Sequence, residues 1–280
     1  MPRPPQEVAL TREARQYARG IVEGATLDAK LVAPSGVVDG EPGPALRLER
    51  PGRPPELRWS QHGRVKVPNV EGMADPAQRV RILHALANHE LQAVELFAWA
   101  LLAFPEAPAA FRRGLLRRIA EEQRHVRMYV QRLDALGTRL GDFPVSGYFW
   151  SKTPGLTTPL RFVCAMGLTF ENANLDHTAL YEAAALRAGD VTTARLLRRV
   201  GADEIAHVRF AWRWLLAWKR PDESPWEAYS ANVIWPLRGA LARGKSFHAE
   251  IRRAVGLDEE FIRKLAASDR GSPRTGTASR

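Results

Sequence analysis

Two copies of one pattern of glutamate and histidine carry the chemistry of this 280-residue chain. In chain order the residues are Glu90, Glu122 and His125, followed by Glu171, Glu204 and His207. The first and second glutamates of each copy lie 32 and 33 residues apart. In four-helix bundles that hold two metal ions, two helices each supply one glutamate, and the other two each supply a Glu-x-x-His pair. The repeated pattern therefore predicts a two-metal site with these six residues as ligands.

Each Glu-x-x-His pair has the spacing that a shared metal ion needs. Residues three apart lie on one face of an α-helix, so Glu122 and His125 can reach the same ion. The same holds for Glu204 and His207. Carboxylates with one imidazole per metal suit iron or manganese, and a single cysteine excludes a thiolate cluster. We therefore expect two iron ions, with manganese in one or both positions as the alternative.

Helix-terminating residues predict that the first two ligands lie level with each other. An Asp-Pro pair, typical of a helix start, opens a predicted helix over 76–103, and Pro108 and Gly137 bound a second helix. Glu90 is 13 residues from the end of the first helix, and Glu122 is 13 residues from the start of the second. Both intervals correspond to roughly 20 Å. An antiparallel hairpin would bring the two glutamates together.

The second half of the chain repeats this hairpin with a poorer register. A Thr-Pro pair opens a helix at about residue 159 that ends at Gly189, and Asp190 can cap a helix that runs to about residue 219. Glu171 lies about 17 residues from its helix end, whereas Glu204 lies about 13 from its helix start, an offset of roughly 6 Å. A third helix that ends one turn early would absorb this offset.

The helix faces that carry the ligands are apolar. Glu90 belongs to a stripe whose other members are Leu83, Ala87, Val94, Phe97 and Leu101. A buried ionised carboxylate is costly unless it is paired or bound to a metal. Four such glutamates with two histidines at matching offsets favour a metal site over the alternative, in which they form surface pairs on charged helices.

The chain outside the four helices predicts extensions around one bundle. A connection of 22 residues, carrying several aromatics, is long enough to cross between the two hairpins. The expected parts are an N-terminal extension over 1–74, with one helix at about 8–23 and extended pairs around 45–67; the bundle over 75–220; short C-terminal helices packed on it over 221–268; and a disordered tail over 269–280.

Composition narrows the class of protein further. No run of apolar residues is long enough for a membrane span, and one cysteine is consistent with a reducing cytoplasm, where we expect the protein. The net charge of +10 is compatible with a nucleic-acid partner such as tRNA. However, 35 of the 41 basic residues are arginine, a bias that a GC-rich genome also produces, and their pairs fall on helix faces that favour solvation. We therefore rank nucleic acid below a small organic substrate.

Several segments resemble an uncharacterised ferritin-like family known only as a domain of unknown function. They are HELQAVELFAWALLAFP at 89–105, EEQRHV at 121–126, GDFPVSGYFW at 141–150, FENANLD at 170–176 and DEIAHVRFAWRW at 203–214. The likeness covers roughly 75–265, although the family commonly has Asn where this chain has His248. It implies an all-α, ferritin-like four-helix bundle, with two antiparallel hairpins joined by a long crossover, and the six ligands above. It does not specify a reaction.

More distantly, the layout is similar to tRNA-isopentenyladenosine hydroxylases and to bacterial multicomponent monooxygenases. In the monooxygenases an acidic residue before each Glu-x-x-His motif hydrogen-bonds a ligand histidine of the opposite helix. The resemblance implies this role for Glu121 and Asp203. A carboxylate on the free ring N–H would fix the histidine tautomer and strengthen the ligand. The alternative is that both are solvated acidic residues.

Other residues of suitable chemistry are expected to lie outside the site. Glu95 is five residues from Glu90, about 140° around the helix, and should face another surface. His84 is expected to be a packing residue, Tyr129 a core tyrosine and Cys164 a small buried thiol.

These observations favour an oxygen-activating di-iron oxidoreductase that hydroxylates or oxidises an organic substrate with dioxygen or peroxide. The substrate and the electron donor are not specified by the sequence. A ferroxidase or iron-handling protein is the second reading, and a binding or scaffold protein with a structural dimetal site is the third. Hydroxylation of tRNA is a less favoured form of the first.

Overall fold

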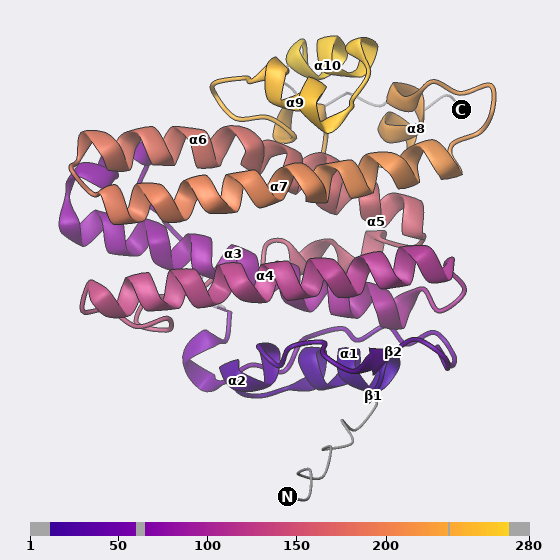
Figure 1. Cartoon of the computed structure of the whole chain (residues 1–280), viewed down its shortest axis with the longest axis horizontal. Helices are drawn as coiled ribbons and strands as arrows, with labels where there is room; N and C mark the ends of the chain where they lie inside the picture. Colours follow the sequence, from indigo (N-terminus) through magenta and orange to yellow (C-terminus); the bar gives the residue numbers. More distant parts are fainter. Residues whose placement is uncertain (1–11, 60–64, 235, 269–280) are drawn as a thin grey trace, which may run out of the picture. The chain divides into compact units, whose positions relative to one another are not determined.

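The computed structural model describes residues 12–59, 65–234 and 236–268, and these are mostly helical (Figure 1). This confirms the all-α prediction. The chain divides into two compact units. The first unit comprises Met1–Pro159 and Tyr181–Val200, and the second comprises Leu160–Leu180 and Gly201–Arg280.

Two long antiparallel helices dominate the first unit. Helix α3 spans Pro76–Ala103 and helix α4 spans Ala109–Ala135, close to the predicted bounds. Asp75 caps α3, since its carboxylate accepts a hydrogen bond from the Gln78 backbone N–H at 2.8 Å. The two helices pack along each other (Figure 1).

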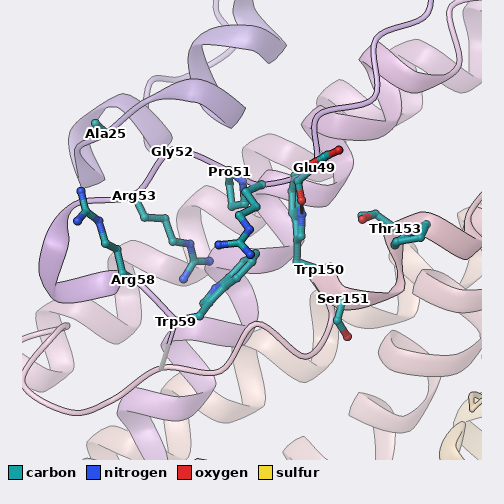
Figure 2. Close-up of a pocket in the computed structure, with 12 residues that line it drawn as sticks. Ala25, Glu49, Pro51, Gly52, Arg53, Arg58, Trp59, Trp150, Ser151 and Thr153 are labelled. Atoms are coloured by element: carbon teal, nitrogen blue, oxygen red, sulfur yellow. Dashed lines mark hydrogen bonds between the residues drawn. The ribbon is translucent and has the colours of Figure 1, made fainter. Parts of the chain in front are cut away.

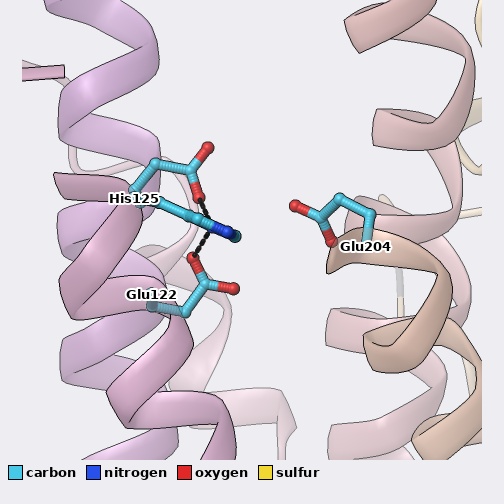
Figure 3. Close-up of side chains that lie close together, drawn as sticks. Glu122, His125 and Glu204 are labelled. Carbon is cyan, nitrogen blue, oxygen red and sulfur yellow. Dashed lines mark hydrogen bonds and ion pairs between the residues drawn. The ribbon is translucent and has the colours of Figure 1, made fainter. Parts of the chain in front are cut away.

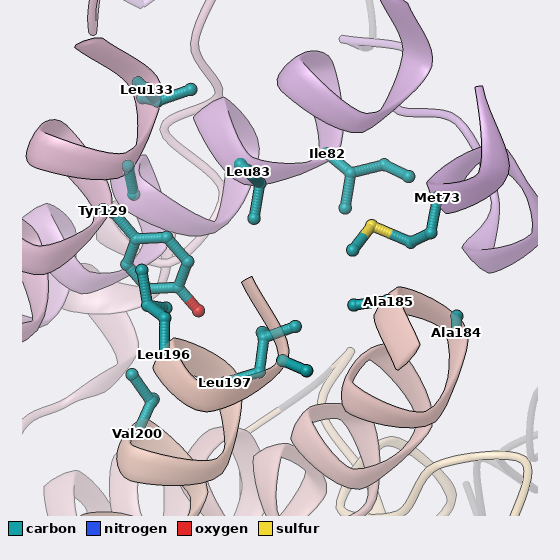
Figure 4. Packing of buried hydrophobic residues seen from close by; sticks show 12 residues of the cluster. Met73, Ile82, Leu83, Tyr129, Leu133, Ala184, Ala185, Leu196, Leu197 and Val200 are labelled. Carbon is teal, nitrogen blue, oxygen red and sulfur yellow. The ribbon is translucent and has the colours of Figure 1, made fainter. Parts of the chain in front are cut away.

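Helices α6 (Asn172–Arg187) and α7 (Val191–Trp218) each contribute one end to the first unit. There they share an apolar core with α3 and α4 (Figure 4). Its members include Ile82, Leu83 and Ala87 of α3, Tyr129 and Leu133 of α4, Ala184 and Ala185 of α6, and Ala194, Leu197 and Val200 of α7. Four helix segments therefore bury their apolar faces against one another within this unit.

Asp190 connects three of these helices. It caps α7 as predicted, because its carboxylate accepts a hydrogen bond from the Thr193 backbone N–H at 2.9 Å. The same carboxylate pairs with Arg132 of α4 at 2.8 Å and with Arg79 of α3 at 3.0 Å. One buried charge thus holds the helix ends of the first unit in register.

The N-terminal part differs from the prediction in two respects. Helix α1 spans Ala14–Glu23 rather than starting near residue 8, and residues 1–11 lie outside the described part of the chain. Arg12–Glu13 (β1) pairs in parallel with Val37–Val38 (β2), and the short helix α2 covers Leu27–Lys30.

The extended pairs expected around 45–67 are not found in the described residues of that stretch. It holds a single isolated bridge, from Trp59 to Val145, and a 3₁₀ turn over Pro55–Leu57. Prolines at 51, 54 and 55 explain this difference, because they lack the N–H that a strand ladder needs. Residues 60–64 lie outside the described part.

The third long helix is not a uniform α-helix. It consists of α5 (Pro159–Ala165), a π-helical segment (Met166–Glu171) and α6, which continues to Arg187. The prediction that this helix ends one turn early is therefore wrong. The irregularity lies inside the helix instead, where the Thr169 hydroxyl donates a hydrogen bond to the Cys164 carbonyl at 2.7 Å.

Three short helices follow α7, as predicted: α8 (Pro225–Asn232), α9 (Ala249–Val255) and α10 (Glu259–Ala266). The buried carboxylate of Asp176 on α6 holds them, because it pairs with Arg252 at 2.9 Å and accepts the backbone N–H groups of Gly244 and His248. The predicted disordered tail, 269–280, lies outside the described residues. Among the helices that are described, none combines the length and apolarity of a membrane span.

The Asp190 carboxylate makes stability depend on pH. Burial raises its pKa, but hydrogen bonds from Thr193 and Arg132 outweigh burial and lower the pKa to about 2. A depressed pKa adds stability above the unfolded value, near pH 4, and that stability is lost as pH falls towards 2. Asp190→Asn keeps the helix cap but removes the charge, so it should cost about 2 kcal/mol of unfolding free energy at pH 7.

Urea denaturation of the wild type and of Asp190→Asn at several pH values tests this effect. The difference in unfolding free energy should shrink between about pH 4 and pH 2. A difference that stays constant over this range would show that the carboxylate charge does not stabilise the fold.

Candidate metal centre

Helices α3 and α4 bring the first three predicted ligands together within the first unit. The Nδ1 atom of His125 lies 3.5 Å from Oε2 of Glu90 and 3.3 Å from Oε2 of Glu122 (Figure 3). All three side chains are buried, and their ligand atoms lie within 4.8 Å of one another. The pairing of α3 with α4 thus places Glu90 level with the Glu122–His125 pair, as the hairpin register predicts. We call these three residues the first triad.

Burial makes the first triad unfavourable for negative charge. It raises the pKa of Glu90 to about 7, and the neighbouring carboxylate of Glu122 adds to the shift, while hydrogen bonding to His125 opposes it. A group with this pKa needs a proton or a cation at neutral pH. A divalent metal ion would satisfy both carboxylates and the imidazole at once.

The second triad consists of Glu171, Glu204 and His207 and lies wholly in the second unit. The Nδ1 atom of His207 lies 3.5 Å from Oε1 of Glu171 and 3.4 Å from Oε2 of Glu204. These side chains are also buried, with their ligand atoms within 4.8 Å of one another. The distances match those of the first triad to within 0.1 Å, so the repeat in the sequence is a repeat in local geometry.

A glycine allows the helix of Glu171 to approach α7. A Cβ atom added to Gly167 would lie only 2.1 Å from Cβ of Ala211 and 3.4 Å from Oε2 of Glu171. Glu171 is also the last residue of the π-helical segment, a local feature that is common at functional sites. The absence of a side chain at Gly167 therefore leaves room for both the helix packing and the ligand carboxylate.

Asn174 is a site residue that the sequence prediction missed. Its Nδ2 atom donates a hydrogen bond to Oε1 of Glu204 at 2.7 Å, whereas Oε2 of Glu204 faces His207. The amide thus fixes which oxygen of Glu204 is directed at the imidazole. The available signal was the spacing, since Asn174 lies three residues after Glu171 and therefore on the same helix face.

The donor set of each triad fits a metal ion. Two carboxylates and one imidazole offer oxygen and nitrogen atoms to one point, without a thiolate, which suits iron, manganese or zinc rather than a soft metal. Buried carboxylates near each other are also stabilised by a bound cation. These buried Glu/His groups can therefore bind metal ions.

Residues predicted to lie outside the site do so in the structure. Glu95 is fully buried and pairs with Arg53 at 2.6 Å and with Lys30 at 3.2 Å. His84 accepts a hydrogen bond from the Gly141 backbone N–H at 2.8 Å, and burial lowers its pKa to about 4, so it stays neutral. Cys164 is buried, and burial raises the pKa of its thiol.

The two acidic residues expected to support the histidines are half-buried. Glu121 pairs with Arg118 one turn away, at 2.7 Å, so one of its oxygens has a partner on its own helix. Asp203 directly precedes Glu204 on α7. The contact of each with a ligand histidine stays a prediction.

Comparisons with known proteins place no activity on this site. A family model described as "Protein of unknown function (DUF455)" matches residues 1–263. Neither a curated protein nor a solved structure matches the chain.

Close packing at Gly167 yields a prediction with an internal control. Gly167→Ala should destabilise the protein by about 1–3 kcal/mol, because the new methyl group overlaps Ala211. It should also lower the retained metal, because the same methyl group crowds Glu171. Adding Ala211→Gly removes the overlapping Cβ and should restore both properties, measured by thermal unfolding and metal analysis. A single variant as stable and metal-rich as the wild type would contradict the packing argument.

Proposed function

The chain belongs to the DUF455 family of proteins of unknown function, and we propose that it is a dimetal oxidoreductase. In this proposal the two triads form one centre for two metal ions, most suitably iron, inside a ferritin-like four-helix bundle. The observation that carries the proposal is the repetition of one buried Glu, Glu, His geometry on two helical hairpins.

The register of the helices supports a shared centre. On each of three helices, a ligand lies one turn from a residue of the apolar core in the first unit. The pairs are Ala87 and Glu90 on α3, His125 and Tyr129 on α4, and Val200 and Glu204 on α7. Because α7 continues unbroken from Val200 to Glu204, the layer of ligands would follow directly after the shared apolar layer.

The residues of the chain would bind, orient and shield the metals. Glu90, Glu122 and His125 would hold one ion, and the second triad would hold the other. Asn174 would keep Glu204 in its ligating orientation through the hydrogen bond to Oε1. The buried side chains around the triads exclude water, which strengthens every electrostatic interaction in the site. Bound iron ions supply one-electron and oxygen chemistry that no protein side chain can provide.

We propose dioxygen or peroxide as the oxidant and an organic molecule as the substrate that is hydroxylated or otherwise oxidised. Ferroxidase or iron-handling activity and a structural dimetal site are the competing functions, and tRNA is the less favoured substrate. These functions differ in what happens to ferrous iron in air and in whether an organic product forms.

Metal content tests the centre itself. Wild-type protein loaded anaerobically with ferrous iron should retain close to two iron ions per chain, as measured by elemental analysis. His125→Ala and His207→Ala should each lower retention strongly, because each removes the only nitrogen ligand of its triad.

His89→Ala is the matched control. This histidine directly precedes Glu90, but its ring packs against Phe149 with centroids 4.8 Å apart. Metal retention should therefore be unchanged. Retention near zero in a folded wild-type protein, or equal loss in the His89 variant, would refute the assignment.

Exposure of the ferrous protein to air tests the redox function. Oxidation of the iron, followed by colorimetric assay of remaining ferrous ion, should be complete within minutes and should slow in Glu171→Gln and Glu204→Gln, because anionic ligands stabilise the ferric state. Iron that stays ferrous for hours would support a structural site. Oxidation that consumes oxygen without any organic product across a substrate panel would support ferroxidase activity.

A further inference from the structure

A second cavity lies in the first unit, away from the triads, and none of the predicted ligands lines it (Figure 2). It has a volume of about 830 Å³, which is large enough for a small organic ligand. Its walls come from two segments, 49–59 and 150–154, and we call it the Trp59–Trp150 pocket.

Two indole rings form a rigid aromatic wall of this pocket. The centroids of Trp59 and Trp150 are 6.2 Å apart, with the ring planes inclined by 43°. Trp59 lies against the backbone at Gly147, where an added Cβ would approach the indole to 2.4 Å. Trp150 donates a hydrogen bond from Nε1 to the carbonyl of Glu49 at 2.7 Å. Both rings are therefore held in place without any ligand.

Polar residues of α3 fix the pocket walls from beneath. The side-chain oxygen of Gln92 accepts the backbone N–H groups of Phe149 and Trp150, both at 3.2 Å. Arg53 lines the pocket, with its guanidinium 5.4 Å from the Trp59 ring centroid, and its ion pair with the buried Glu95 holds it there. The pocket is thus prearranged, which lowers the entropy cost of binding.

The charge at the base of the pocket is positive. Glu95 is one carboxylate, yet it faces two buried cations, Arg53 at 2.6 Å and Lys30 at 3.2 Å. The ammonium group of Lys30 is further held by the carbonyls of Ile21 and Val22. One positive charge of this group is not matched by Glu95, and it favours an anion above it.

Two further arginines line the pocket from its exposed side. Arg50 and Arg58 have no carboxylate partner among the residues that the structure describes. The one acidic lining residue, Glu49, directs its carboxylate to the Trp150 end, away from Arg58 (Figure 2). Guanidinium groups bind carboxylates and phosphates through paired N–H donors.

We propose that the Trp59–Trp150 pocket binds a small aromatic anion. A planar ring of the ligand lies against the indole wall, and its carboxylate or phosphate group pairs with Arg50 and Arg58. In addition, Nε1 of Trp59 is buried without an acceptor among the described residues, so a ligand oxygen can accept its hydrogen. This site is separate from the metal triads, and the inference stands whether or not they hold iron.

Intrinsic tryptophan fluorescence and calorimetry test binding with named probes. Adenosine 5′-monophosphate and 1-naphthoate carry the two kinds of anionic group, and adenosine and 1-naphthalenemethanol are their uncharged counterparts. At least one anion should bind at least tenfold more tightly than its counterpart, because only the anion pairs with the arginines. A preference for the nucleotide identifies a phosphate ligand, and a preference for the naphthoate identifies a carboxylate ligand.

Variants assign the binding to this pocket. Arg50→Gln and Arg58→Gln should each weaken binding about tenfold, since each removes a charge-assisted hydrogen bond. Trp59→Leu should abolish it. Arg113→Gln changes an exposed arginine of α4 in the same unit that does not line the pocket, and it should leave affinity unchanged.

The proposal is overturned if neither anion binds at millimolar concentration, if the uncharged counterparts bind equally well, or if the arginine variants keep wild-type affinity. The two arginine variants alter exposed side chains, so their result does not depend on a disturbed core. Iron content should be the same in all these variants and the wild type, which separates this result from the outcome for the metal centre.

Discussion

Burial of carboxylate charge is the constraint on which this structure depends. Each triad places two glutamates and a histidine out of contact with water, where an isolated ionised carboxylate is unfavourable by several kcal/mol. The pKa of Glu90, raised to about 7 by burial and by Glu122, expresses this strain directly. A bound cation relieves it, which makes metal binding and folding mutually stabilising. The helices that supply these residues are therefore coupled through the site as well as through their apolar core.

The fold neutralises other buried carboxylates in a different way. Asp190, Asp176 and Glu95 each pair with a buried or half-buried arginine, and these pairs join helix ends, the C-terminal helices and the N-terminal segment to the long helices. The contrast is clearest between Asp190, whose pKa is lowered, and Glu90, whose pKa is raised. Carboxylates that hold the fold together have arginine partners, whereas those of the triads face histidine and one another. This difference separates structural charge from charge that is available to a metal.

Much of this was determined by the sequence itself, because it depends on residues close together in the chain. The bounds of α3 and α7, the caps Asp75 and Asp190, and the placing of Glu and His on one helix face follow from local hydrogen bonding and from the helical period. The six ligands were predicted for this reason, and each triad forms as the spacing requires. The exclusion of Glu95 from the site followed from the same period, since it lies on another face of α3 than Glu90.

Only the tertiary structure decided which partners distant residues find. Glu95 meets Arg53 and Lys30, 42 and 65 residues away, and nothing local to Glu95 announces either. The π-helical segment before α6 and the contact of Gly167 with Ala211 likewise depend on how closely two helices approach. The Trp59–Trp150 pocket is assembled from segments about 90 residues apart, as is usual for ligand sites. Local periodicity specifies helices and faces, but close approach between them is set by the packing of all side chains together.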